Sequence, residues 1–295
     1  MSNVLLLRAA NQDSPDRYEN AFRSRGYHPI SVPVLETVIV CREELARRLS
    51  IGPEKQDLSG VIITSQRAVE AWFEAAQALI TADNNTPLKP ESDWWSVPFY
   101  AVGEATSVAL RDLCEKIPMY TPRDIRGGSE TGTAERLAGF ILKDLPSDGT
   151  SRKLFYLTGD KNRDTLPRIL ESAGVALDPL QVYATQGSSM FPHDLSLALE
   201  HEGSSWGWIV YFAPSVAEFV TPILRNHFAL PVVNLSTEPE DCTQLSEYHR
   251  VKVAAIGPTT ESFLQQTLKL SVAVTARNPK ADDLADAVLQ HDEAQ

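Results

Sequence analysis

Apolar and polar positions alternate along this chain in blocks that predict strands followed by helices. The clearest block covers residues 153–185, where an apolar run at 154–157 breaks at Thr158-Gly159-Asp160 and is followed by a helical pattern that Gly174 ends. A second apolar run at 180–183 closes the block. This order of strand, loop, helix and strand is the signature of a βαβ unit. The N-terminal segment repeats the order, which indicates that one unit has been used twice.

The remaining predictions follow from the same periodicities. Further strands are predicted at residues 4–7, 61–63, 99–102, 119–120, 208–212, 251–256 and 271–274. Helices are predicted at residues 15–24, 41–49, 66–80, 106–113, 133–142, 216–225, 261–268 and 281–289. A long extended segment at 30–40 is broken at Pro33, residues 82–95 and 227–248 are irregular, and 127–132 form a glycine-rich loop before a helix.

Blocks in the two halves of the chain match in the same order. VIITSQRAVEAW pairs with IVYFAPSVAEF, and FYAVGEATSVAL pairs with VAAIGPTTESFL. We interpret the match as an internal duplication. Since the second βαβ unit ends the first set of blocks, the N-terminal unit belongs with the C-terminal set. The sequence therefore predicts one discontinuous α/β domain, residues 1–36 plus 186–295, with a second α/β domain, residues 37–185, inserted into it.

Alternating strands and helices favour a doubly wound parallel sheet in each domain. Ligands of such sheets bind outside the carboxyl ends of the strands, at the loops that lead into helices. Two facing sets of these loops with a hinge between them would form a cleft.

Composition narrows the class of protein. Of 295 residues, 43% are apolar and 22% are charged, which is typical of globular domains. The apolar runs are strand-sized, so no membrane span is expected, and MSNVLLLRAA predicts a first strand and not a signal peptide. Cys41, Cys114 and Cys242 are widely spaced, which supports neither disulfides nor a metal site and favours a reducing, cytoplasmic setting. The net charge of -12 argues against nucleic-acid binding, but it does not exclude an anionic small substrate.

The turns that link strands to helices carry the candidate chemistry. Free N–H groups at helix N-termini bind carboxylates and phosphates, although Ser and Thr at the same positions also serve as helix caps. Several such turns directed into one cleft favour binding for the set. No GxGxxG or GxxxxGK[ST] motif is present, so nucleotide binding lacks support. The turns lie at residues 64–66, 103–106, 158–160, 213–215 and 257–260.

Tyr183 differs from the turn residues because it lies where the chain leaves one domain for the other. A tyrosine in a strand is most often a packing residue. At a domain crossing, its phenol can instead point into the cleft and hydrogen-bond a leaving hydroxyl. The basic residues near the turns are surface charges or anion ligands; they are Arg8, Arg67, Lys161 and Arg163.

No nucleophile–base set is visible, because none of the 6 histidines falls in the strand-to-helix turns. Paired carboxylates do not recur in these turns either, since Glu104 and Asp160 belong to different blocks. An enzyme built on this chain would therefore act by positioning and hydrogen bonding more than by strong acid–base groups.

In order along the chain, VIITSQRAVEAW, YAVGEATSVAL, LTGDKNRDTLPRIL followed by VYAT, YFAPSVAEF and AAIGPTTESFL resemble the blocks of the uroporphyrinogen-III synthase family. The resemblance spans essentially the whole chain. It implies two α/β domains joined by a two-stranded linker, no cofactor, and a linear tetrapyrrole substrate, the polycarboxylate hydroxymethylbilane. The reaction it implies closes this chain to uroporphyrinogen III, inverting ring D through a spiro intermediate and releasing water.

The resemblance also implies roles for individual residues. Tyr183 matches the tyrosine of the family's VYxT motif, which would assist departure of the hydroxyl. Ala213 stands where the family commonly has serine, so a hydroxyl contact there is lost or supplied by Ser215. Together with the turn and basic residues, the expected substrate-binding set is Arg8, Ser65, Thr106, Gly159, Lys161, Ser215, Gly257, Pro258, Thr259 and Thr260.

Two other functions compete with this one. A non-catalytic two-domain protein could close on a polycarboxylate ligand, and a nucleotide-dependent transferase could share the sheet architecture. The missing phosphate-loop motifs count against the transferase. Nothing in the sequence indicates oligomerisation, so a monomer is expected.

Overall fold

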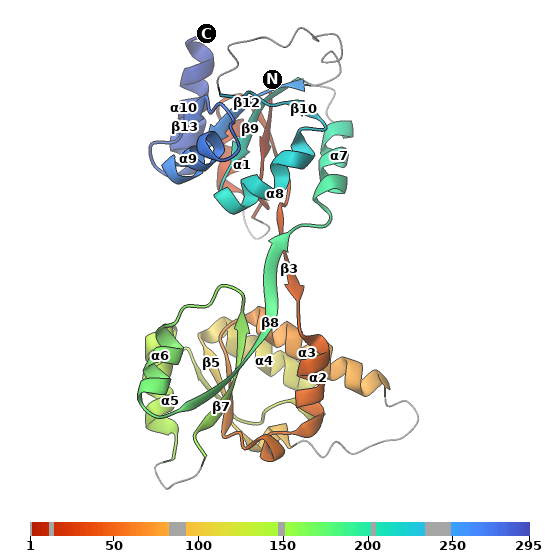
Figure 1. Ribbon diagram of the computed structural model, residues 1–295, viewed down its shortest axis with the longest axis vertical. Coiled ribbons are helices and arrows are strands. Elements are labelled where there is room, and N and C mark those ends of the chain that lie inside the picture. Colours follow the sequence, from red (N-terminus) through yellow and green to blue (C-terminus); the bar gives the residue numbers. More distant parts are fainter. Residues whose placement is uncertain (1, 12–14, 83–92, 147–150, 202–204, 234–248) are drawn as a thin grey trace. The chain divides into compact units, whose positions relative to one another are not determined.

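The computed structural model describes residues 2–11, 15–82, 93–146, 151–201, 205–233 and 249–295 (Figure 1). The chain forms two compact units, unit 1 from Met1–Glu36 with Gln186–Gln295 and unit 2 from Thr37–Thr185. It passes between the units within β3 (Leu35–Ile39) and again within β8 (Ala176–Gly187). These two strands are neighbours in one sheet, with the Val40 N–H donating to the Val182 carbonyl at 2.9 Å.

Unit 1 is built on a five-stranded parallel sheet in the order β13-β12-β9-β1-β2. Its strands are β1 (Asn3–Leu6), β2 (His28–Ser31), β9 (Trp206–Tyr211), β12 (Lys252–Ala255) and β13 (Val274–Thr275). Two-residue strands β10 (Phe228–Ala229) and β11 (His249–Arg250) pair separately. Its helices are α1 (Arg17–Arg23), α7 (Phe191–His201), α8 (Pro214–Leu224), α9 (Pro258–Gln266) and α10 (Ala281–Glu293).

Side chains that alternate along β1 show why helices cover both faces of this sheet. Val4 and Leu6 are buried with residues of α1 and α10, whereas Leu5 and Leu7 are buried with residues of α7, α8 and α9. Because successive strand residues point to opposite faces, an uninterrupted apolar run requires a cover on each side.

Unit 2 repeats this plan in a six-stranded sheet ordered β3-β8-β7-β4-β5-β6. The new strands are β4 (Gly60–Ile63), β5 (Phe99–Val102), β6 (Ile125–Gly128) and β7 (Lys153–Gly159). One face packs on α2 (Arg42–Ile51), α3 (Gln66–Ala82) and α4 (Glu104–Lys116). The other packs on α5 (Ala134–Asp144) and α6 (Thr165–Ser172). Short 3-10 helices are η1 (Glu54–Gln56), η2 (Trp94–Ser96) and η3 (Pro118–Tyr120).

The two sheets share one strand order. The order β2-β1-β9-β12-β13 in unit 1 corresponds block by block to β8-β7-β4-β5-β6 in unit 2, and this is the pairing that the sequence blocks predicted. The predicted fold class, doubly wound parallel α/β sheets, is confirmed. In each sheet the winding reverses beside the first strand, between β1 and β9 and between β7 and β4, and such reversals are where ligands bind.

Two local predictions were wrong. Residues 119–120 are not a strand but part of η3, because Pro118 occupies its first turn and the Tyr120 N–H donates to the Ile117 carbonyl at 3.2 Å. Gly127 and Gly128 are not a loop but the end of β6, paired with β5. Their φ angles of 88° and 67° lie in the left-handed region, which explains why this strand end carries glycine.

Other elements differ in extent. The strand predicted at 154–157 continues to Gly159, and its partner extends through Gly187, so the expected turn at Thr158-Gly159 begins only at Asp160. Helix α7 was missed, although Phe191 and Leu195 stand at helical spacing and are buried. The strand predicted at 271–274 is reduced to Val274–Thr275. Of the predicted irregular segments, residues 83–92 and 234–248 lie outside the described residues.

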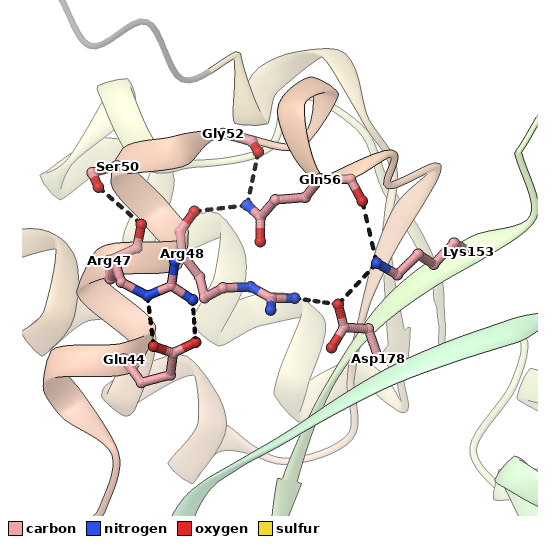
Figure 2. A network of polar contacts seen from close by, with 8 residues as sticks. All are labelled: Glu44, Arg47, Arg48, Ser50, Gly52, Gln56, Lys153 and Asp178. Atoms are coloured by element: carbon pink, nitrogen blue, oxygen red, sulfur yellow. Dashed lines mark hydrogen bonds and ion pairs between the residues drawn. The ribbon is translucent and has the colours of Figure 1, made fainter.

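A polar network joins α2, η1, β7 and β8 near the amino end of β7 (Figure 2). Arg48 pairs with Asp178, and the Lys153 Nζ lies 3.2 Å from the same carboxylate. The Arg48 guanidinium also lies over the Phe155 ring, 4.9 Å from its centroid. Burial alone would raise the pKa of Asp178, but the hydrogen bonds from Arg48 and Lys153 outweigh it and lower the pKa.

We expect Asp178→Asn to lower the free energy of unfolding of unit 2 by about 2 kcal/mol, because two partly buried cations lose their shared anion. Glu44→Gln is the matched control, since the Glu44–Arg47 pair on the same helix has side chains 40% and 56% exposed. Its loss should cost less than about 0.5 kcal/mol. Urea denaturation measures the loss of stability in both variants. Equal losses would show that Asp178 contributes no more to stability than an exposed ion pair does.

Candidate active site

A cavity of about 470 Å³ opens in unit 2 around the carboxyl ends of β4 and β7. Thr64 directly follows β4, Tyr156 comes from β7, and Tyr183 comes from β8. The N-terminal turns of α5 and α6 complete the wall, with Thr133 capping α5 by accepting from the Arg136 N–H at 3.3 Å. The cavity therefore lies where the winding of this sheet reverses.

Tyr183 is held from several sides. In the register of β7 and β8 it lies opposite Gly159. Its ring packs on the apolar cluster beneath α2, α3 and α4, and the Arg67 guanidinium carbon lies 5.8 Å from the ring centroid. The structure records no hydrogen bond from its hydroxyl to another described residue. The phenol is therefore available to a ligand in the cavity.

Tyr156 is a second phenol in this wall, and it was not among the residues predicted from the sequence. Its side chain is buried, with 4% of the residue exposed. Burial raises the pKa of Tyr156 and the neighbouring Tyr183 adds to the rise, while a hydrogen bond with Thr64 opposes it. Like any phenol at neutral pH, the Tyr156 hydroxyl is protonated and can donate a hydrogen bond. The only signal in the sequence was a hydroxyl inside an apolar run.

The loop between β7 and α6 gives the cavity positive charge. Lys161 and Arg163 are exposed and line it, and no ion pair of either with another described residue is recorded. Two hydrogen bonds hold the first part of this loop: the Gly159 N–H donates to Asn162 Oδ1 at 3.3 Å, and the Thr185 N–H donates to Asp160 Oδ2 at 3.2 Å. Glu135 contributes one acidic group to the lining.

The other two predicted residues of unit 2 are engaged in the protein. Ser65 Oγ accepts from the Ala68 N–H at 3.3 Å and so helps to cap α3. Thr106 lies in the first turn of α4 and is 4% exposed. Glu104 in that turn adds negative charge, paired with Arg111 at 2.5 Å. In the described conformation the Thr106 hydroxyl is not presented at the surface.

In unit 1, Arg8 follows β1 and lines a cavity of about 450 Å³ with residues at the start of α1. Its guanidinium pairs with Asp16 at 2.7 Å and lies 4.9 Å from the centroid of the Tyr18 ring. Asp16 also caps α1, accepting from the backbone N–H groups of Tyr18 and Glu19. Much of the charge of Arg8 is therefore already balanced within the protein.

The remaining predicted residues lie at the starts of α8 and α9, which follow the neighbouring strands β9 and β12. Ala213 is the N-cap of α8 and provides no side-chain cap, while Gly257 takes that place in α9. Ser215, Pro258 and Thr259 are exposed, whereas Thr260 is 3% exposed. This edge of unit 1 thus presents two hydroxyls, from Ser215 and Thr259.

Protonation of Asp16 gives a pH-dependent stability. Burial would raise the pKa of Asp16, but hydrogen bonds from Arg8 and from the backbone N–H groups of Asn11 and Glu19 lower it to about 2. We therefore expect about 2 kcal/mol of stability to be present above pH 4 and to be lost as the pH falls toward 2. Asp16→Asn should be about 2 kcal/mol less stable than the parent at pH 7 and nearly as stable as the parent at pH 2. Denaturation of both proteins at several pH values measures this. A difference in stability between them that persists at pH 2 would contradict the assignment.

Neither a metal site nor a membrane-spanning helix is found among the described residues. Within the described ranges, no group of three or more His, Cys, Asp or Glu side chains is placed to hold a metal ion. Among those same residues, no helix combines the length and apolar character needed to cross a membrane.

Comparison with known proteins places this arrangement in a family. The family model described as uroporphyrinogen-III synthase HemD matches residues 16–286. The chain belongs to the uroporphyrinogen-III synthase family. The assignment made from the ordered sequence blocks is confirmed.

Relatives in the uroporphyrinogen-III synthase family match along nearly their whole length. The uroporphyrinogen-III synthase of Saccharomyces cerevisiae is 29% identical over 293 residues, covering 97% of this chain and 94% of its own. That of Schizosaccharomyces pombe is 27% identical over 293 residues, covering 99% and 98%. The solved structure of uroporphyrinogen-III synthetase from Helicobacter pylori is 15% identical, covers 98% of this chain and 99% of its own, and gives a TM-score of 0.42.

Proposed function

We propose that this chain converts hydroxymethylbilane to uroporphyrinogen III, inverting ring D and releasing water. The observation that carries the proposal is family membership over residues 16–286. The cavity supports it chemically, because it combines phenols and cations without a nucleophile–base set. Such a site suits a reaction in which the protein chooses between two ring closures of a reactive intermediate.

In this proposal the Tyr183 phenol donates its proton to the terminal hydroxyl, which leaves as water. The resulting azafulvenium cation is attacked by the substituted carbon of ring D, giving a spiro intermediate that keeps the positive charge. Fragmentation and reclosure then join the inverted ring D to the macrocycle. The proton released when that pyrrole regains aromaticity returns the phenol to its starting state. The protein's main task is to hold the chain in the shape that favours spiro attack.

Carboxylates of the substrate are proposed to bind at helix N-termini and at basic side chains. Exposed Ser215 and Thr259 can contribute hydroxyls, whereas buried Thr106 and Thr260 can contribute only through the N–H groups of their turns. The two compact units are proposed to be the two domains, residues 1–36 plus 186–295 and residues 37–185. The residues proposed to contact the substrate are Arg8, Ser65, Thr106, Lys161, Ser215, Gly257, Pro258, Thr259 and Thr260. Gly159, which was expected in the same set, is buried beneath the Tyr183 ring and is proposed to act through that ring.

The test supplies the purified chain with hydroxymethylbilane made in the reaction mixture and resolves the product isomers by chromatography. Unassisted closure gives the uninverted type I isomer, so a reaction without the chain is the control. We expect the type III isomer to predominate. Accumulation of type I alone would reject catalysis and leave the alternative, a cleft protein that binds a polycarboxylate without chemistry. Retention of the substrate on the inactive chain would identify that alternative.

The proposal includes a monomer acting in the cytoplasm, with no cofactor and no nucleic-acid partner. The free thiols of Cys41 and Cys114 suit a reducing compartment, and a net charge of -12 disfavours nucleic acid. Size-exclusion chromatography with light scattering checks the oligomeric state, and a mass twice that of one chain would contradict it.

A further inference from the structure

Gly159 lies against the ring of Tyr183 more closely than any other residue type could. A Cβ built on Gly159 would stand 2.4 Å from Tyr183 Cε2, 2.4 Å from its Cζ and 2.7 Å from its hydroxyl oxygen. Real Cβ atoms essentially never approach within 3.0 Å of another heavy atom. The ring of Tyr183 therefore occupies space that only a missing side chain leaves open.

The backbone at this position gives no separate reason for glycine. Gly159 ends β7, and it is not among the described glycines with positive φ, unlike Gly174 at 78°. An L residue could adopt its conformation without strain. The close approach to the phenol is thus the feature that requires glycine here.

We propose that Gly159 is a positioning residue for Tyr183, and that its missing Cβ seats the phenol at the mouth of the unit 2 cavity. This inference rests on the proposed function, in which the phenol acts on the substrate. It gives Gly159 a role distinct from a direct substrate contact, because the residue is buried and acts through the ring that covers it.

A Cβ at Gly159 would displace the side chain of Tyr183 and not the backbone of a neighbouring strand. The atoms it would meet are at the far end of the Tyr183 side chain, which can rotate away. At Gly127, by contrast, a Cβ would meet the Ala101 carbonyl oxygen at 2.6 Å, which belongs to the neighbouring strand. Gly159→Ala should therefore move the phenol and leave the sheet intact.

The kinetic test is a double-mutant cycle of Gly159→Ala, Tyr183→Phe and the double variant, each assayed for the type III isomer. Gly159→Ala should lower kcat about 100-fold with KM changed less than about threefold, as expected for misplacing a group that acts in the transition state. In the Tyr183→Phe background the same change should cost less than about twofold. The control is Gly139→Ala, since a Cβ at Gly139 meets nothing within 4 Å. Equal losses in both backgrounds would overturn the proposal.

A spectroscopic arm separates this inference from the proposed function. Tyrosines labelled with ¹³C at Cζ are followed by NMR, and the Tyr183 signal is assigned by its loss in Tyr183→Phe. Gly159→Ala should shift that signal, whereas Gly139→Ala should not. If the parent makes no type III isomer but Gly159→Ala shifts the Tyr183 signal, the proposed function is rejected and the positioning role of Gly159 is kept. If the parent is active but Gly159→Ala leaves the Tyr183 signal unshifted, the positioning role is rejected.

Folding provides the last check. If Gly159→Ala fails to fold, the clash has been taken up by the sheet, and removing the ring should relieve it. Gly159→Ala with Tyr183→Ala is then expected to regain the parent's circular dichroism spectrum. A double variant that stays unfolded would show that the ring is not what Gly159 accommodates, and would overturn the proposal.

Discussion

Tyr183→Phe is expected to lower the turnover of hydroxymethylbilane to the type III isomer about 100-fold, with KM changed less than about threefold. The change removes one oxygen and keeps the ring, so the packing on the cluster beneath α2, α3 and α4 and the contact with Arg67 remain. Only the proposed hydrogen bond to the departing hydroxyl would be lost. Since unassisted closure continues, the fraction of type I isomer should rise as enzymatic turnover falls.

The control removes a phenol hydroxyl elsewhere. The Tyr27 hydroxyl donates to Asp292 at 2.6 Å within unit 1, and Tyr27 is not among the residues that line the cavity of unit 2. Tyr27→Phe should cost about 1 kcal/mol of stability and leave the isomer ratio unchanged. Steady-state kinetics with product chromatography measures both variants. If Tyr183→Phe keeps the activity of the parent, the Tyr183 hydroxyl has no part in the reaction. The positioning of Tyr183 by Gly159 would then not contribute to catalysis.

Strand and helix order could be predicted because it depends on periodicity within short windows. Strand β4, for instance, is an apolar run followed by Thr64 and Ser65, and the apolar run of β9 is likewise followed by a turn, at residues 213–215, that leads into a helix. Burial on both faces forces such runs to be apolar throughout, so the pattern survives in both copies. The duplication then predicted which strands of one sheet correspond to which strands of the other, because matched blocks take matched places in a sheet.

The details that could not be predicted depend on contacts between residues far apart in sequence. Asp178 stands before the apolar run at 180–183 and was not singled out, yet its carboxylate pairs with both Arg48 and Lys153. Gly159 reads as a turn glycine, yet its register against Tyr183 gives it a different use. Arg8 was expected to meet an anion, and the structure shows the carboxylate of Asp16 beside it. The sequence near each residue does not predict such pairs, because the two partners are distant or their contact depends on the fold.

Trp94 is a case where local composition was misleading. It follows a polar segment and was placed in an irregular insertion, but it is fully buried. Its ring meets Trp72 edge-on at a centroid distance of 5.0 Å and lies 6.4 Å from Phe99. Its Nε1 donates to the Leu49 carbonyl at 2.9 Å, so the indole is both packed and hydrogen-bonded. It anchors the chain that leads into β5 against α2 and α3.

We therefore expect Trp94→Ala to lower the free energy of unfolding by about 4 kcal/mol, because it removes a fully buried indole and leaves the Leu49 carbonyl without its donor. The adjacent Trp95 is the matched control: it is 45% exposed and contacts the Arg123 guanidinium at 4.8 Å. Trp95→Ala should cost less than about 1 kcal/mol. Urea denaturation followed by circular dichroism compares the stabilities of the two variants. If Trp94→Ala does not fold, Trp94→Phe replaces it and is expected to lose roughly half as much stability. Equal stability of the Trp94 and Trp95 variants would show that η2 is not part of the core of unit 2.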